Sequence, residues 1–132
     1  GLVVRQETAR VEKDNSLLYE MTYLGREIRI NDILVAKPVF MSENDEFFAY
    51  IYERPWVKIS IDEMKKDLQI ADFKKSVASM LADLNITGSI RKIFAPNASA
   101  KAIEFRNPIT RGFADKNKLP DLKLVDRSNK KE

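Results

Sequence analysis

Residues 61–85 narrow the possible folds of this chain most, because they contain two consecutive amphipathic helical patterns. The first pattern begins at a capping box formed by Ser60 and Glu63. The second is expected over residues 72–84, with apolar residues at steps of three and four: Phe73, Val77, Met80, Leu81 and Leu84. Its opposite face carries Lys75, Ala78, Ser79 and Ala82, with Lys74 at the edge. This small, weakly basic face suits either close approach to an acidic partner or an ordinary alanine-rich surface helix.

Alternating apolar residues near the start of the chain predict a small antiparallel sheet. The alternation runs through residues 16–24 and 26–30, which we expect to pair as a hairpin around Leu24-Gly25. Residues 33–36 are expected to add a short third strand, which Pro38 would end or confine to an edge.

A further helix is expected between this sheet and the two helical patterns. Ser42 with Asp45 three residues later is typical of a helix start, and Pro55 ends the apolar pattern that follows. Residues 57–59 alternate around a lysine and predict a short strand directly before Ser60.

The segment after Gly88 is expected to form a second hairpin. Residues 89–94 and 100–105 have strand-like composition and flank a turn-rich stretch, residues 95–99. From residue 107 onward, prolines, a glycine and many charges leave little to form a core. We therefore expect a flexible arm over residues 1–15, one folded domain over 16–106, and a mostly flexible basic tail over 107–132.

The composition excludes several classes of chemistry. The 132 residues are 44% hydrophobic and 33% charged, as in a soluble globular protein, and include no cysteine or histidine. Disulfides, thiol nucleophiles, imidazole catalysis and Cys/His zinc sites are thereby excluded. The acidic pairs Asp45/Glu46 and Asp62/Glu63 are explained as helix caps, and no phosphate-binding glycine motif occurs. We expect no enzyme, no metal and no cofactor; with no membrane-length apolar run, we expect a cytoplasmic protein.

The order of expected elements resembles the winged helix-turn-helix effector domains of OmpR/PhoB-type transcriptional regulators. In that family an antiparallel sheet precedes three helices and a C-terminal hairpin wing. The residues that match the family's arrangement are Arg54, Pro55, Ile59, Ser60, Asp62 and Glu63. The resemblance implies an α+β fold in which residues 72–84 form the recognition helix. The chain departs from the family because this helix carries lysines and no arginine, and because its first sheet has two or three strands rather than four.

The resemblance and the charge distribution together indicate binding to nucleic acid. Residues 1–70 carry 10 Lys/Arg and 13 Asp/Glu, whereas residues 71–132 carry 13 and 7, so the second half is basic. A recognition helix in the major groove and a wing along the backbone would use these candidate contacts: Lys74, Lys75, Ser79, Arg91, Lys92, Lys101, Arg106 and Arg111.

Two functions remain open from the sequence. The first is a transcriptional or replication-associated regulator that binds duplex DNA with modest specificity, because lysine alone reads bases poorly. The second is a winged-helix adaptor that binds a protein, favoured by acidic residues beside the lysines. Base stacking is a lesser alternative to a structural role for the larger aromatic residues: Tyr19, Tyr23, Tyr50, Tyr52 and Trp56.

Overall fold

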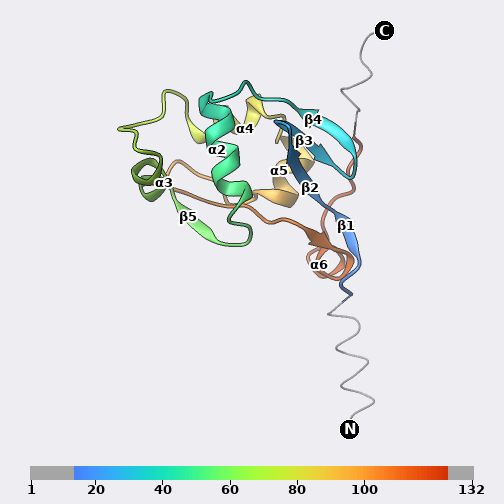
Figure 1. Cartoon of the computed structure of the whole chain (residues 1–132). Coiled ribbons are helices and arrows are strands. Elements are labelled where there is room, and N and C mark those ends of the chain that lie inside the picture. The colour runs from blue at the N-terminus through green and yellow to red at the C-terminus, as the bar shows by residue number, and fades with distance from the viewer. Residues whose placement is uncertain (1–13, 125–132) are drawn as a thin grey trace.

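The computed structural model describes residues 14–124, which form five helices and three small antiparallel sheets (Figure 1). The expected α+β class is confirmed. The arm predicted for residues 1–15 lies outside the described residues except for its last two positions, as does the end of the predicted tail, residues 125–132.

Residues 17–19 were expected in the first strand of the hairpin but pair with residues 109–110 instead. The N-terminal sheet otherwise contains the predicted hairpin and the predicted third strand. Its strands are β2 (Met21–Leu24), β3 (Glu27–Ile30) and β4 (Ile33–Ala36), in the order β2-β3-β4. Gly25 and Arg26 both have left-handed backbone angles, with φ of 58° and 61°, as a two-residue type I′ hairpin turn requires. The sheet's alternation places Met21, Ile28 and Ile30 in the core.

Two helices begin where their capping residues predict. Helix α2 (Glu43–Tyr52) starts after Ser42, whose side chain accepts a hydrogen bond from the Asp45 amide. Helix α3 (Ile61–Leu68) starts after Ser60, which accepts from the Glu63 amide. In each case a hydroxyl satisfies an amide that the first helical turn cannot pair internally.

The helix expected over residues 72–84 is shorter than predicted. Helix α4 covers Val77–Asp83 rather than starting at residue 72, and Ser76 caps it through the Ser79 amide. The preceding amides of Lys74 and Lys75 donate instead to the Glu43 carboxylate, at 2.6 and 3.1 Å. Because Glu43 binds this backbone in a non-helical conformation, the first turn of the expected helix does not form.

The prediction of a hairpin after Gly88 is wrong. Residues of its first strand form helix α5 (Gly88–Phe94) instead. The second expected strand is present as β6 (Ala102–Glu104), but it pairs with β5 (Lys58–Ser60). Ile90, Ile93 and Phe94 share one side of a helix equally well, and Ile93 and Phe94 are fully buried in α5. A hairpin wing therefore does not form within residues 14–124.

The segment expected to be a tail contributes structure to the described part of the chain. Strand β7 (Ile109–Thr110) pairs with β1 (Leu17–Tyr19), and helix α6 (Arg111–Lys116) follows directly. Asn107, buried just before β7, accepts from the Met21 amide at 2.8 Å and donates to the Met21 carbonyl at 2.9 Å. Its side-chain amide thus makes the two hydrogen bonds with Met21 that a neighbouring strand would otherwise make.

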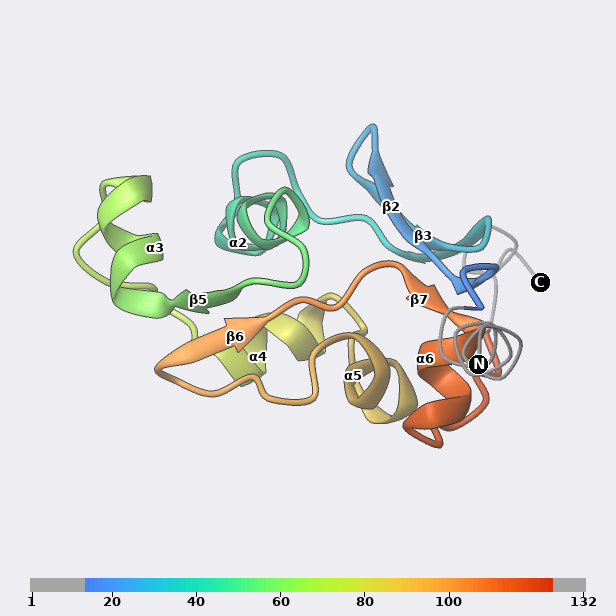
Figure 2. The same ribbon diagram turned by 90° about the horizontal axis from the view of Figure 1, so that it is seen from below.

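The core lies on both faces of the segment that leads from β6 to β7. Figure 2 shows α2 and the β2–β3–β4 sheet on one side of this segment and α4 and α5 on the other. Phe105 joins the two sides, with ring centroids 5.6 Å from Phe48 of α2 and 6.2 Å from Phe94 of α5. All three rings are fully buried, so this aromatic contact holds the helices together.

Replacing Asn107 by alanine is expected to lower the free energy of unfolding by about 2–6 kcal/mol. The substitution leaves the amide and the carbonyl of buried Met21 without partners, and each unpaired group costs about 1–3 kcal/mol. Urea denaturation followed by circular dichroism measures the change. Asn117→Ala is the matched control, because Asn117 is exposed and donates only to the Phe113 carbonyl. Equal losses in both variants would contradict this account.

Candidate nucleic-acid interface

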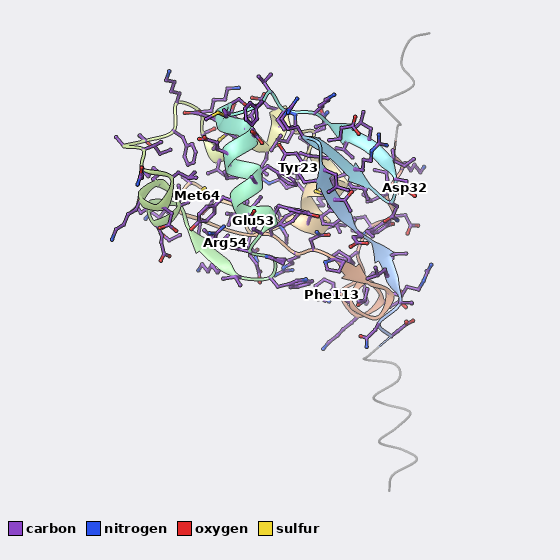
Figure 3. The ribbon with its side chains drawn as sticks, viewed as in Figure 1. Tyr23, Asp32, Glu53, Arg54, Met64 and Phe113 are labelled. Carbon is purple, nitrogen blue, oxygen red and sulfur yellow. The ribbon has the colours of Figure 1, made fainter. Side chains whose placement is uncertain are left out.

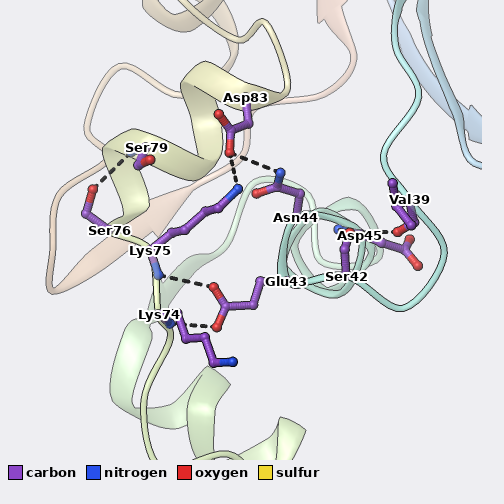
Figure 4. Close-up of polar contacts among 10 residues, drawn as sticks. All are labelled: Val39, Ser42, Glu43, Asn44, Asp45, Lys74, Lys75, Ser76, Ser79 and Asp83. Atoms are coloured by element: carbon purple, nitrogen blue, oxygen red, sulfur yellow. Dashed lines mark hydrogen bonds and ion pairs between the residues drawn. The ribbon is translucent and has the colours of Figure 1, made fainter.

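The lysines expected on the recognition helix lie in the loop before it. Figure 4 shows Lys74 and Lys75 preceding α4, with their backbone amides held by Glu43. The Lys75 ammonium lies 2.5 Å from the Asp83 carboxylate at the end of α4. Ser79 is exposed on α4. The helix itself carries no basic residue over Val77–Asp83, so its exposed face offers no cation to a groove.

The ion pair also changes the titration of its acid. The hydrogen bond from Lys75, and then that from the Asn44 amide, hold the pKa of Asp83 below its ordinary value. A carboxylate stabilised in this way keeps its charge beside Lys75 at neutral pH. The positive charge that the sequence assigned to this region is therefore compensated locally, in a mixed arrangement that a phosphate backbone would not favour.

Arg91 and Lys92 lie on α5 rather than on a strand. The Arg91 guanidinium donates to the Ala98 carbonyl at 3.1 Å, which fastens the loop between α5 and β6. Lys92 is exposed in the last turn of the helix. Arg91 thus has a structural contact, whereas Lys92 extends into solvent.

Lys101 lies beside a lysine that the sequence analysis did not single out. Lys101 and Lys58 line one cavity of about 310 Å³ on the β5–β6 ribbon, together with Asn97, Ser99 and Glu104 among others. Within residues 14–124 neither lysine makes an ion pair with a carboxylate. Glu104, the acidic residue of the cavity, is bound by Arg106 at 3.1 Å. The cavity therefore presents two ammonium groups without an ion pair in the described part of the chain, and Glu104 lies opposite Lys58 in the ribbon.

Arg106 connects this cavity to an exposed aromatic residue. Its guanidinium lies 6.0 Å from the Trp56 ring and 5.9 Å from the Phe113 ring, and Figure 3 shows Phe113 on α6. Trp56 is 39% exposed at the approach to β5. Arg111 is exposed at the start of α6, where its backbone amide donates to the Ser16 carbonyl. Lys101 and Arg106 thus lie on one ribbon, and Arg111 lies on a different element.

The tyrosines have structural contacts. The Tyr19 hydroxyl accepts from the Leu122 amide, and Tyr52 packs against Phe48. Burial, followed by the hydrogen bond to Asp45, raises the pKa of Tyr23, which extends from β2 towards α2 (Figure 3). The hydrogen bond to Asp67 raises the pKa of Tyr50, which is buried. Of these aromatic residues, Trp56 alone is classed as exposed within residues 14–124.

Lys58, Asn97 and Ser99 belong to the basic cavity and were missed by sequence reasoning. Lys58 carried one usable signal: it is the outward position of an alternating strand. Its proximity to Lys101 depends on pairing between segments more than 40 residues apart, as the register of Lys58 with Glu104 shows. The loop residues carried no local signal.

No family model matches the chain, and neither does any curated protein or solved structure. Among residues 14–124, no helix has the length and apolar character needed to cross a bilayer. Conclusions about function therefore depend on the residues of this chain.

Replacing Lys75 by methionine is expected to raise the pKa of Asp83 towards its ordinary value near 3.8. The folded-state pKa is depressed, so the pair's stabilisation is present above the unfolded pKa and is lost as pH falls through the folded pKa. Carbon-detected NMR titration of the Asp83 carboxyl measures its pKa in the parent protein and in the variant. Lys74→Met removes the same charge without an ion pair to Asp83 and should leave the pKa nearly unchanged. An ordinary Asp83 pKa in the parent protein would contradict the ion pair.

Proposed function

We propose that this chain is a nucleic-acid-binding domain that holds duplex DNA through phosphate contacts from the β5–β6 ribbon. The observation that carries the proposal is that Lys58 and Lys101 line one cavity and neither makes an ion pair within residues 14–124. Lysines beside neutral polar groups are suited to phosphate oxygens, which supply most of the non-specific affinity for DNA. Asn97 and Ser99 provide such groups at the same cavity.

The surroundings of the cavity support the same function. Residues 86–118 contain seven Lys/Arg and two Asp/Glu, giving a local excess of positive charge. Three elements of this segment, α5, β6 and α6, lie in the lower half of the molecule as drawn in Figure 2. Trp56 beside Arg106 adds an exposed aromatic surface that can lie against sugar or base. Such contacts position a protein on DNA without reading bases, so the expected specificity is modest.

The proposal moves the interface away from α4. Lys75, in the loop before α4, is paired with Asp83, and α4 itself carries no cation. A winged-helix relationship is retained as part of the proposal, because β5 lies between α2 and α3 in the chain and pairs with β6, which follows α4 and α5. In this arrangement a single strand and the loop at residues 95–101 take the position that a hairpin wing would occupy.

A protein-binding adaptor is the second candidate function. It is favoured by the exposed apolar side chains around residues 39–41, because soluble proteins rarely expose apolar patches that have no partner. This surface lies at the other end of α2 from β5 (Figure 1). The two functions therefore use different parts of the molecule and are tested separately.

The double variant Lys58→Gln/Lys101→Gln is expected to weaken binding to a random-sequence duplex by about 10- to 100-fold at 50 mM salt. Each lost phosphate contact should also make the slope of log K against log salt shallower by about 0.9. Fluorescence anisotropy with a labelled 20-base-pair duplex, repeated across a salt series, measures both quantities.

Lys74→Gln/Lys75→Gln is the matched control, because it removes the same charge from the loop before α4. Both variants lose the same long-range attraction to DNA, but this one should keep the proposed phosphate contacts. It should therefore weaken binding by no more than about threefold. A larger effect of this control would assign the interface to α4. Absence of binding by the parent protein at 20 mM salt would refute the nucleic-acid function altogether.

A further inference from the structure

Two segments far apart in the chain form an exposed apolar surface at the N-terminal end of α2. The β2–β3 turn contributes Leu24, which is 76% exposed, and the loop before α2 contributes Val39, Phe40 and Met41, which are 75%, 64% and 66% exposed. We call these four residues with Arg26 the 39–41 surface. Arg26 joins the segments, because its guanidinium lies 5.4 Å from the Phe40 ring centroid.

Hydrogen bonds fix the loop in this exposed conformation. The amide and the hydroxyl of Ser42 both donate to the Val39 carbonyl, at 3.1 and 2.6 Å. The Met41 amide donates to the Asp45 carboxylate at 2.7 Å. The other oxygen of that carboxylate accepts from the Tyr23 hydroxyl, which ties the loop to β2. The apolar side chains are thus presented by an ordered backbone, which reduces the entropy lost on binding.

Met41 occupies a conformation that favours glycine. Its φ is 62°, in the left-handed region, where a side chain with a Cβ is disfavoured. Glycine would satisfy the turn and would not expose an apolar side chain to water. A large apolar residue at this position destabilises the free protein in two ways, because its backbone is in the left-handed region and its side chain is exposed to water. A role in binding therefore accounts for Met41 better than a role in folding does.

Arg26 gives the surface a guanidinium that no neighbouring carboxylate within residues 14–124 binds directly. Glu27, the next residue, is bound by Arg29 at 2.9 Å. The two carboxylate oxygens of Asp45 accept from Tyr23 and from the Met41 amide. A carboxylate supplied by a partner would therefore complete the surface beside the Phe40 ring.

We propose that the 39–41 surface docks a segment of another protein that carries apolar side chains next to an aspartate or glutamate. The apolar residues supply the area and Arg26 supplies the orientation. The proposal is independent of nucleic-acid binding, because none of its residues lies on the β5–β6 ribbon.

Two other occupants fit the surface less well. Anionic lipid would be repelled by the acidic residues that begin α2 directly behind the loop, Glu43, Asp45 and Glu46. A second copy of the chain would supply the same five residues, which include no carboxylate to pair with Arg26. A protein segment can place one carboxylate beside Arg26 and away from these α2 acids, which a membrane surface that is negative throughout cannot do.

The test is selection of random 16-residue peptides displayed on phage, with the full chain as bait. Peptides that also bind Phe40→Ser are removed by counter-selection. The remaining peptides should be enriched in large apolar residues adjacent to Asp or Glu. As synthetic peptides, they should lose at least about tenfold in affinity to Phe40→Ser and about threefold or more to Arg26→Gln, measured by calorimetry.

Two further variants separate binding from folding. Met41→Gly should weaken peptide binding while leaving the melting temperature unchanged or raising it, because glycine tolerates the left-handed backbone. Val57→Ser changes an exposed apolar residue directly before β5 and should leave binding unchanged. The proposal is overturned if selected peptides lack acidic residues or ignore Arg26→Gln. It is also overturned if Phe40→Ser abolishes binding to phosphatidylserine vesicles or a dimer seen by sedimentation.

Discussion

The pairing of β5 with β6 determines most of the remaining structure. Ile59 and Ile103 face each other in this ribbon, and both are buried. The ladder continues beyond the strands, because the Trp56 amide donates to the Phe105 carbonyl and the Ile61 amide to the Lys101 carbonyl. Residues 102–104 therefore have their partner in a strand that precedes α3, and residues 89–94 are left without one. A segment with buried apolar groups and no strand partner satisfies its backbone by forming a helix, as α5 does.

Features specified by neighbouring residues were predictable, and features specified by distant ones were not. Ser42 with Asp45 and Ser60 with Glu63 correctly located the starts of two helices, because a cap involves only residues three apart. The first hairpin was predictable because Gly25 permits its turn. The strand predicted at residues 89–94 failed because a six-residue apolar pattern fits either period, and the choice depends on which strand already pairs with β6.

The electrostatics of the candidate interface were likewise only partly predictable from the sequence. Counting charges correctly located the basic half of the chain, yet it could not show which cations are compensated. Had residues 72–84 formed one helix, Lys75 and Asp83 would lie eight residues apart, about 12 Å along its axis. The loop that Glu43 holds before α4 instead lets the lysine extend back along the helix to the aspartate. Conversely, Lys58 and Lys101 share a cavity because their strands pair, which no local pattern encodes.

Helix α2 separates the two surfaces to which functions are proposed. Its first turn follows the loop that carries Phe40, and the chain leaves its last turn towards β5 (Figure 1). Ten helical residues span about 15 Å, and Phe48 fastens the middle of the helix to Phe105 in the core. A peptide at the 39–41 surface therefore does not cover Lys58 or Lys101, and DNA on the β5–β6 ribbon does not cover Phe40. If both proposals hold, the domain can bind a protein and a nucleic acid at the same time without a conformational change, because a rigid buried helix fixes the separation between the two surfaces.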